Sequence, residues 1–312
     1  MGKVIVVGSF NMDLVVRAQK IPRPGETLLG GEFFTALGGK GANQAVAAAR
    51  MGAQVTFVCR IGEDASGDAA LKSFEQDQIN TRFVSRDPKL PTGTAVIIVA
   101  QDGQNSIVVA PGANGALNSE CIEKAFPEVA SNDVLLAQLE TPLEGIEKIF
   151  EHARSLGKIT ILNPAPARAL PASLLKWVSV ITPNETETES LTGVAVTDAN
   201  SAKKAAILLH ERGIPIVIIT LGEKGAYVSD ASRDHSSLSD GELIPAPKVE
   251  TVVDTTAAGD VFSGALAEAL ASQKLDLKSA VEFAMTAASV SVTRLGAQSS
   301  IPYLRELNLR LK

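Results

Sequence analysis

Short runs of β-branched, apolar residues alternate with helix-forming segments along most of this chain. KVIVVG (3–8) and VTFVCRIG (55–62) predict strands, and GANQAVAAARMG (41–52) between them predicts a helix that ends at Gly52. These strands read as continuous apolar runs, which is typical of strands buried on both faces. The alternation therefore predicts a three-layer α/β/α fold with a mostly parallel central sheet.

The same alternation continues toward the end of the chain. Further strands are predicted at 133–139, 159–163, 178–182, 214–220 and 249–254, and further helices at 66–77, 144–157, 198–212, 258–271 and 277–290. A chain of 312 residues with 45% hydrophobic and 21% charged residues can bury a core of this size. We therefore expect one large α/β domain with an appendage.

Two segments without helices interrupt the alternation. TLLGGEFFTALGG (27–39) and TAVIIVAQDGQNSIVVAPG (94–112) predict strands, and the Asp-Gly pair in the second is typical of a hairpin turn. These strands either form a small separate sheet that projects from the main body or extend the edge of the main sheet. We favour the small separate sheet.

Composition and charge argue against several other classes of protein. The net charge is −6 without a Lys/Arg run, which argues against nucleic acid as the main partner. No apolar run approaches the ~20 residues that cross a bilayer, and the start of the chain does not resemble a signal peptide, so we expect a cytoplasmic protein. Cys59 and Cys121 predict buried free thiols, and the three histidines are too far apart for a histidine metal site.

Polar clusters follow five of the predicted strands. SFNMD (9–13), Glu140, PNETE (183–187), LGEKG (221–225) and DTTAAGD (254–260) each come after such a strand. In a doubly wound sheet, ligands bind beyond the carboxyl ends of the strands. The clusters therefore predict a single site that is assembled from distant parts of the chain.

The cluster DTTAAGD combines small residues with two carboxylates at the predicted start of a helix. Ala257, Ala258 and Gly259 leave their N–H groups accessible, and the first turn of a helix attracts an anion. Fixed donors of this kind stabilise a phosphoryl group during transfer, and Asp260 could accept a hydroxyl proton. Alternatively, Asp254 or Thr256 caps the helix and Asp260 only complements its dipole.

The polar residues near the start of the chain suit a sugar. Asp13 could accept hydrogen bonds from two neighbouring hydroxyls, and Asn11 adds an amide. GGKGAN (38–43) is a glycine-rich turn into a helix that brings backbone close to a ligand. The alternatives are an Asx turn at Asp13 and simple helix entry at the glycines.

Two further clusters have equally simple alternatives. LGEKG could let backbone pass along a nucleotide or could only turn the chain into the next strand, and NETE (184–187) could bind a ligand or cap the next helix. Familiar nucleotide motifs are absent, since Phe34 stands where a P-loop needs glycine and GKGANQ does not complete the dinucleotide fingerprint.

With these motifs in place, the sequence resembles the PfkB-type, ribokinase-like carbohydrate kinases over essentially its whole length. GGKGANQAVAAARMG is similar to the first signature of that family, and DTTAAGDVFSGAL is similar to the second. The resemblance implies a single kinase domain (1–312) with a β-sheet lid at about 14–38 and 92–112. It also implies transfer of the γ-phosphoryl group of ATP to the 5-hydroxyl group of D-ribose.

The resemblance also implies a role for individual residues. Asp260 would be the catalytic base, and Ala257, Ala258, Gly259 and Asp260 would form an anion hole. The ribose site would comprise Asn11, Met12, Asp13, Gly39, Lys40, Gly41, Ala42, Asn43, Glu140 and Asp260. ATP would contact Asn184, Thr220, Leu221, Gly222, Glu223, Lys224, Gly225, Gly259, Asp260 and Met285. Met285 departs from the asparagine that is common there in the family, and a thioether cannot make the hydrogen bonds of an amide.

Cations and a partner subunit are implied in the same way. Glu187 would help to hold Mg²⁺ through water, because Mg²⁺ usually keeps several waters. A monovalent cation, K⁺, would bind near Asp254, Thr256, Ser291, Arg294, Gly296 and Ser300, mostly through backbone carbonyls. The lid strands are apolar on both alternating faces, so we expect a homodimer through residues around 29–36 and 94–110.

Two alternatives to a ribose kinase stay open at this point. A kinase of the same family could act on deoxyribose, a ketohexose or a nucleoside. A catalytically silent sugar-binding regulator could use the same fold, although the intact Asp260 and its small-residue corner argue against silence.

Overall fold

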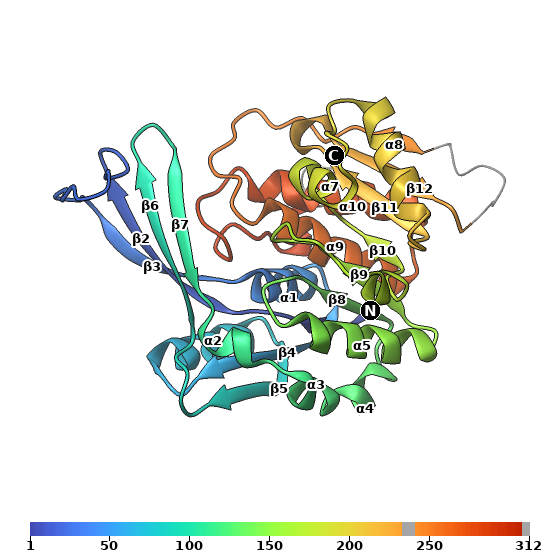
Figure 1. Cartoon of the computed structure of the whole chain (residues 1–312), viewed down its shortest axis with the longest axis horizontal. Coiled ribbons are helices and arrows are strands. Elements are labelled where there is room, and N and C mark those ends of the chain that lie inside the picture. Colours follow the sequence, from blue (N-terminus) through green and yellow to red (C-terminus); the bar gives the residue numbers. More distant parts are fainter. Residues whose placement is uncertain (233–240, 308–312) are drawn as a thin grey trace.

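The computed structural model describes residues 1–232 and 241–307. Within these ranges the strands form a nine-stranded sheet and a separate four-stranded sheet, and the smaller sheet projects from the side of the main body (Figure 1). A small separate sheet containing the segments 27–39 and 94–112 was predicted. The alternative, that these segments extend the main sheet, is wrong.

The nine-stranded sheet has the order β13-β12-β11-β10-β9-β8-β1-β4-β5. Its strands are β1 (Lys3–Val7), β4 (Gln54–Gly62), β5 (Asn80–Asp87), β8 (Val134–Ala137), β9 (Ile159–Leu162), β10 (Val180–Ile181), β11 (Ile216–Thr220), β12 (Ala226–Asp230) and β13 (Glu242–Ile244). The pairs from β5 to β11 are parallel, and β12 and β13 add an antiparallel edge. The prediction of a mostly parallel central sheet is confirmed.

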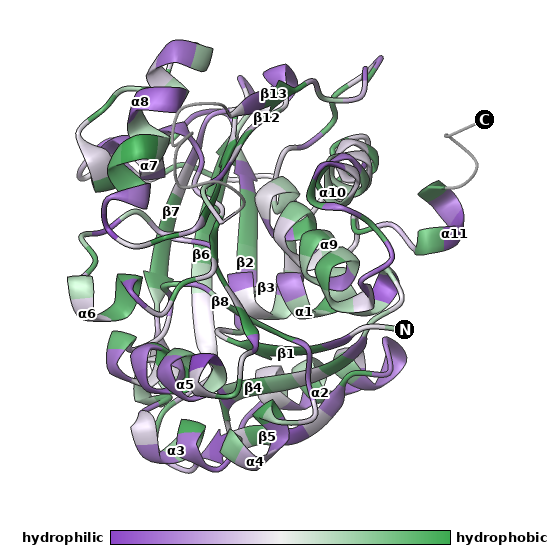
Figure 2. Ribbon diagram, turned by 90° about the vertical axis from the view of Figure 1, so that its right-hand side faces the viewer, coloured by the Kyte–Doolittle hydropathy of each residue, from purple (hydrophilic) through white to green (hydrophobic). Residues whose placement is uncertain are grey.

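Helices cover both faces of this sheet. They are α1 (Lys40–Arg50), α2 (Ala65–Gln76), α3 (Ser119–Glu123), α4 (Phe126–Val129), α5 (Leu143–Ser155), α6 (Ala172–Leu175), α7 (Glu185–Thr192), α8 (Ala199–His210), α9 (Ala258–Ser272), α10 (Leu277–Ser291) and α11 (Leu304–Leu307). Figure 2 shows hydrophobic residues along β1 and β8, with α1 and α9 on one side of the sheet and α5 on the other.

The strand β1 shows why both faces are covered. Val4 and Val6 pack into one hydrophobic cluster with residues of α1, α2, α9 and α10. Ile5 and Val7 point the other way, into a second cluster with residues of α5 and α8. Because successive side chains of a strand point to opposite faces, an unbroken apolar run requires a helix layer on each side.

The four-stranded sheet has the order β3-β2-β6-β7. Its strands are β2 (Asn11–Ala18), β3 (Phe33–Gly38), β6 (Gly93–Ala100) and β7 (Asn105–Ala110). The predicted hairpin joins β6 to β7, and Gly103 adopts a φ of 85° in its turn. NMD (11–13) was predicted to be a loop after the first strand, but it begins β2 and therefore belongs to the small sheet.

One prediction about strands was wrong, and two edge strands, β5 and β13, were not predicted. Residues 249–254 form no strand, because the N–H groups of Val253 and Asp254 donate to the carbonyl oxygen of Val292 and the Val252 side chain is 58% exposed. The edge strand β5 was not predicted, since its sequence NTRFVSRD mixes charged and apolar residues.

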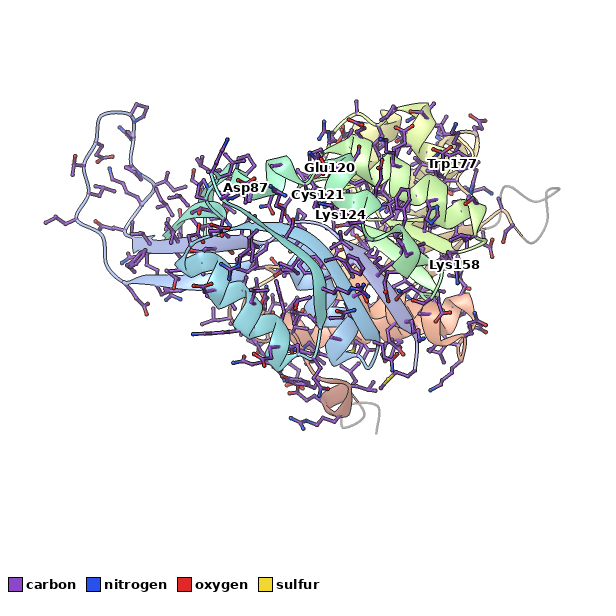
Figure 3. All side chains as sticks on the ribbon, turned by 90° about the horizontal axis from the view of Figure 1, so that it is seen from below. Asp87, Glu120, Cys121, Lys124, Lys158 and Trp177 are labelled. Atoms are coloured by element: carbon purple, nitrogen blue, oxygen red, sulfur yellow. The ribbon has the colours of Figure 1, made fainter. Side chains whose placement is uncertain are left out.

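The cysteines are both free, but only one is fully buried as predicted. Cys59 lies inside β4, whereas Cys121 is half-buried on α3. Arg60 donates a hydrogen bond from Nη1 to the Cys121 sulfur at 3.1 Å and pairs with Asp87, in the region labelled in Figure 3. Within the described ranges, no helix is both long and apolar enough to cross a membrane.

Candidate active site at the carboxyl edge of the central sheet

The corner that precedes α9 is shaped by an unusual backbone. Ala257 adopts left-handed angles (φ 62°, ψ 8°) just before the helix begins at Ala258, and no side chain in the described part of the chain caps this end. Capping by Asp254 or Thr256, the alternative considered from the sequence, is therefore wrong. A left-handed alanine is strained, and such strain concentrates at functional sites.

This corner lines an open cavity, although the Ala258 N–H group donates to the Thr255 carbonyl oxygen at 3.2 Å. Within the described chain, a Cβ built on Gly259 would meet no atom within 4 Å outside its chain neighbours and its own helix backbone. First-turn N–H groups have no helical acceptor, and the helix dipole adds positive potential at this end. The corner can therefore hold an anion, as its sequence predicts.

Asp260 lies in the first turn of α9 and is 6% exposed. Its Oδ2 accepts a hydrogen bond from Asn43 Nδ2 at 2.9 Å, and its Oδ1 accepts one from Gln44 Nε2 at 2.9 Å. Burial raises the pKa of Asp260, while Lys40 and the two amides oppose that shift. A buried carboxylate with fixed donors and a raised pKa is suited to accept a proton.

The small sheet contributes Asn11 and Asp13. Asp13 lies inside β2, so the Asx-turn alternative is wrong. Burial, with a contribution from Glu140, raises its pKa to about 7. A Cβ at Gly38 on the neighbouring strand would lie 2.3 Å from Asp13 Oδ2, which explains why glycine occupies that position.

Met12 and Asn11 have structural partners. Met12 packs against the larger hydrophobic cluster, and successive residues of a strand point to opposite faces, so its side chain points away from that of Asp13. Asn11 Oδ1 accepts a hydrogen bond from Asn114 Nδ2 at 2.8 Å. Asn11 is therefore positioned by a residue that the sequence did not single out.

The glycine-rich turn enters α1 and also packs tightly against β1 and the loop that follows it. Gly39 has a φ of 88° at the helix start, and a Cβ on Gly41 would lie 2.4 Å from Ser9 N. The Lys40 N–H group donates to Glu140 Oε2 at 3.0 Å, and Ser9 Oγ donates to the same oxygen at 2.5 Å. The glycines form the helix entry, as the simpler interpretation predicts, and their close approach is to the loop after β1. Their approach to a ligand stays a prediction.

The Lys40 ammonium group interacts electrostatically with the Asp260 carboxylate. The Asp260 carboxylate is the largest cause of the raised pKa of Lys40, with burial opposing it. Next to it on α1, Ala42 is fully buried and its N–H group donates to the Ser9 carbonyl oxygen at 2.8 Å. The start of α1 is thus fixed to the loop after β1.

A cavity of about 160 Å³ brings many of the predicted residues together. Its lining includes Lys40, Asn184, Glu187, Thr220, Ala257, Ala258, Gly259 and Asp260 from the predicted set, together with Asn163, Ala165, Thr182, Thr255 and Phe262. A larger hollow of about 570 Å³ lies near the amino ends of the strands, lined by Lys3, Gln54 and Asn80 among others. We take the smaller cavity as the site because it contains the buried carboxylate and the helix start.

The two remaining clusters form the structures that their simpler interpretations predict. Asn184 accepts a hydrogen bond from the Glu187 N–H group at 2.8 Å and Glu187 accepts one from the Asn184 N–H group at 3.0 Å, so the pair is a capping box for α7. LGEKG turns β11 into β12, and Gly225 has a φ of 108° beside Ile244. Asn184 and Glu187 nevertheless also line the cavity.

Several predicted nucleotide contacts lie outside that cavity. Leu221, Gly222, Glu223, Lys224 and Gly225 belong to the β11–β12 turn and do not line it. Met285 is 6% exposed and packs in the hydrophobic cluster between α10 and its neighbours. Thr220 therefore lines the cavity, whereas the turn residues 221–225 lie outside its lining and Met285 lies in the core.

The residues predicted to hold a monovalent cation lie in two adjacent segments, the loop before α9 and the end of α10 with the loop that follows it. Asp254 Oδ2 accepts a hydrogen bond from Gly296 N at 2.9 Å, and its Oδ1 accepts one from Thr256 N at 2.9 Å. Burial raises the pKa of Asp254, but the bonds from Thr256 and Gly296 outweigh it and lower the pKa. This carboxylate therefore links the loop before α9 to the loop after α10.

The other members of that set are oriented in different ways. Ser291 Oγ donates to the Ala288 carbonyl oxygen and Ser300 Oγ donates to that of Ala297, while the Arg294 side chain pairs with Glu306. Within residues 1–232 and 241–307, no three His, Cys, Asp or Glu side chains cluster as a metal site. His235 lies outside the described residues.

Four positioning residues were not predicted, Gln44, Asn114, Gln138 and Asn163, and a fifth, Ser9, lies in the predicted cluster SFNMD but was not singled out. All five side chains are buried. Gln44 directly follows GGKGAN, and Asn163 ends the predicted strand ITILN, so their positions beside recognised motifs were the available signal.

Comparison with known proteins adds an independent finding. Residues 1–304 match the model of the pfkB family carbohydrate kinases. A ribokinase from Haemophilus influenzae is 46% identical over 301 residues, covering 96% of this chain and 95% of that protein. A deoxyribokinase from Salmonella typhi is 36% identical over 306 residues, covering 98% of this chain and 97% of that protein.

A solved structure of a ribokinase is also similar to this chain. The ribokinase of Arabidopsis thaliana, determined in complex with ribose and ATP, superposes with a TM-score of 0.90 at 30% sequence identity. The match covers 100% of this chain and 99% of that chain.

Proposed function

Because the chain belongs to the pfkB family of carbohydrate kinases, we propose that it transfers the γ-phosphoryl group of ATP to the 5-hydroxyl group of D-ribose, giving D-ribose 5-phosphate and ADP. The observation that carries this proposal is the buried Asp260 carboxylate next to an uncapped helix start that faces a cavity. Together these groups supply a base for a hydroxyl and a cradle for an anion.

The proposed reaction uses the two parts of this site in one step. Asp260 accepts the proton of the sugar hydroxyl as that oxygen forms a bond to the γ-phosphorus, while the bond to the β–γ bridging oxygen breaks and ADP leaves. The N–H groups of Ala258, Gly259 and Asp260 meet the charge that spreads over the transferred oxygens. Lys40 lines the same cavity and adds a positive charge.

The sugar contacts are assigned to the residues between the two sheets. Asp13 accepts hydrogen bonds from neighbouring hydroxyls, and Asn11, Asn43 and Glu140 complete the set, together with the backbone of residues 39–42. The half-buried side chain of Met12 is left out of the set, because it packs against the hydrophobic cluster and points away from Asp13. The positions of Asn11 and Asp13 on one lid strand support this assignment.

The nucleotide and the divalent cation are assigned to the cavity, whose lining does not include Asn11, Asp13, Asn43 or Glu140. Asn184 and Thr220 line it, and the turn that contains Gly222 and Gly225 gives backbone for the nucleotide to pass along. Glu187 is buried and already bound to Asn184, so it suits a magnesium ion held through water rather than directly. When bound, magnesium neutralises phosphate charge.

We further propose that K⁺ activates the enzyme, that two copies associate through their lids, and that the enzyme acts in the cytoplasm. The loops 254–256 and 291–300 would hold K⁺ next to the anion corner. The exposed apolar residues of the small sheet support the dimer. The need for ATP and the two free cysteines support the compartment.

A second candidate function is phosphorylation of deoxyribose. It is favoured by the deoxyribokinase relative, which matches this chain over nearly its full length. A phosphorylation screen with ATP and magnesium across pentoses, deoxyribose, hexoses and nucleosides tests both candidates. Preference for deoxyribose would replace the ribose assignment, and no turnover with any sugar would favour a binding protein.

A further inference from the structure

Gln44 is a fully buried side chain on α1 that contacts the carboxylate of Asp260. Its Nε2 group donates to Asp260 Oδ1 at 2.9 Å and to Asn163 Oδ1 at 3.0 Å. A primary amide has two N–H bonds, so both donors of Gln44 are used.

The other end of the Gln44 amide is occupied as well. Gln138, which directly follows β8, donates a hydrogen bond from Nε2 to Gln44 Oε1 at 2.5 Å. Because this contact requires an acceptor, it fixes which end of the Gln44 amide faces Asp260. The Asn163 amide is oriented in turn by its donation to the Thr182 carbonyl oxygen at 3.2 Å.

The backbone leaves little room for Gln138 to move. A Cβ on Gly8 would lie 2.1 Å from Gln138 Oε1, so the absence of a side chain at Gly8 makes space for this amide. Gln138 is 1% exposed, and its Oε1 has no hydrogen-bond partner within the described residues.

We propose that Gln44, held by Gln138 and Asn163, is a positioning residue that fixes the direction of the Asp260 carboxylate toward the substrate hydroxyl. This inference rests on the proposed function, in which Asp260 is the base. The two oxygens of Asp260 receive their side-chain hydrogen bonds from α1, through Asn43 and Gln44. The contacts that join Gln138 and Asn163 through Gln44 to Asp260 form a relay. This relay links α9, the helix that carries the base, to α1 and to the ends of β8 and β9.

The same contacts act on the charge of Asp260. Lys40 faces it from α1 and favours the ionised form, whereas Glu140 and Glu187 face it from the end of β8 and from α7 and oppose ionisation. The donor of Gln44 adds to the effect of Lys40. Loss of that donor is expected to make Asp260 harder to ionise, so that a higher pH is needed for activity.

The first test replaces Gln44 while keeping its shape. Gln44→Met removes both donors, and turnover is expected to fall roughly tenfold, a part of the general-base contribution. The KM values for sugar and for ATP should change little, and the acidic limb of the pH–turnover profile should move to higher pH. Gln44→Glu places a second carboxylate beside Asp260 and should move the same limb further upward.

The second test replaces Gln138, which contacts Gln44 rather than the Asp260 carboxylate itself. Gln138→Met leaves the Gln44 donors in place but removes the contact that orients them, so a smaller fall in turnover is expected with unchanged KM values. This variant also carries the test if Gln44→Met fails to fold. As a control, His210→Leu removes two buried hydrogen bonds, to Ile214 and Ser229, far from Asp260. It should lower the thermal stability without shifting the pH profile.

Asp260→Asn separates this inference from the proposed function. If Asp260→Asn is inactive while Gln44→Met, Gln44→Glu and Gln138→Met keep turnover and pH profile within about twofold of the parent, the relay has no positioning role and the proposed base stands. If Asp260→Asn itself keeps its turnover, the proposed function has assigned the wrong base.

Discussion

The nine-stranded sheet and the four-stranded sheet differ in how completely they are covered. In the larger sheet, Val4, Ile5, Val6 and Val7 of β1 are fully buried between helix layers. In the smaller sheet, every residue of β7 is exposed, and the Val108 side chain reaches 69% exposure. The two sheets are built from similar apolar residues, so the difference lies in what packs on them.

The two carboxylates of the proposed site, Asp260 and Asp13, differ in the same way, because each belongs to a different sheet's side of the molecule. Asp260 is held by hydrogen bonds from Asn43 and Gln44 before any substrate arrives. Asp13 lies on β2 of the open sheet, and burial and Glu140 raise its pKa without the opposing amide donors that act on Asp260. On the proposed function, the site residues of the covered nine-stranded sheet (the closed part) are positioned before substrate binds. Asp13 of the exposed four-stranded sheet (the open part) would receive its hydrogen bonds from the sugar.

The largest expected effect tests the closed part. Asp260→Asn keeps the shape of the side chain but removes the base, so turnover should fall roughly 10²-fold or more while sugar binding changes far less. Steady-state kinetics on the purified variant measure both quantities. Asp198→Asn is a suitable control, because asparagine can also cap α8 at that position. Near-normal turnover of Asp260→Asn would contradict its role as the base.

The second effect tests the open part. Asp13→Ala removes acceptors for the sugar hydroxyls, and hydrogen bonds to charged groups contribute about 1.5–3 kcal/mol, so the sugar KM should rise roughly 10- to 100-fold. The KM for ATP should stay close to that of the parent. Asp102→Ala, in the β6–β7 turn of the same sheet, is the matched control. An unchanged sugar KM in Asp13→Ala would rule out this contact.

The third effect follows from the charge of Asp13. Its pKa is about 7, so the protonated fraction grows as the pH falls below that value. Because the carboxylate is the form that accepts two hydroxyl donors, the sugar KM should rise by up to about tenfold per pH unit below the pKa. Measuring the sugar KM between about pH 5.5 and 8 tests this. Asp13→Asn should remove the step, and the same step in that variant would assign it to another group.

The sequence could predict the closed part better than the open part. The alternation of buried runs and helices identified the central sheet. DTTAAGD indicated an anion corner only together with the other polar clusters, since capping by Asp254 or Thr256 stayed open. The approach of Gln44 to Gln138 and Asn163 depends on how α1 packs against two strands, which no local pattern contains. Residues 249–254 misled for the same reason, since β-branched residues indicate a strand only where a neighbouring strand is available.

A smaller, several-fold effect is expected from monovalent cations. Asp254 joins the loop before α9 to Gly296, so an ion held between these loops would order the anion corner and add positive potential. Turnover should be higher in K⁺ than in Na⁺ or a bulky organic cation at equal ionic strength. Asp254→Asn should reduce this dependence. Equal rates of the parent enzyme in all three cations would remove K⁺ from the proposal.

The smallest effect on turnover concerns the outer face of the small sheet. The register pairs Leu14 with Val96 and Val96 with Val108, and it pairs Val16 with Ile98. Because side chains alternate along a strand, these five residues share one face, opposite to the face of Asp13. An apolar face of this kind beside an unpaired strand edge is a surface that proteins usually cover.

A second copy of the chain could cover this face by twofold symmetry, since the same patch would then meet itself. Light scattering at micromolar concentration should give twice the monomer mass for the parent. Ile98→Glu and Val108→Glu should give the monomer mass, and turnover at saturating sugar should change less than in any variant above, because neither side chain faces Asp13. Leu156→Glu, at an exposed apolar position beyond α5, is the control and should stay dimeric. A monomeric parent, or a dimer that tolerates both charges, would mean that the open sheet is covered differently, by folding back onto its own main body.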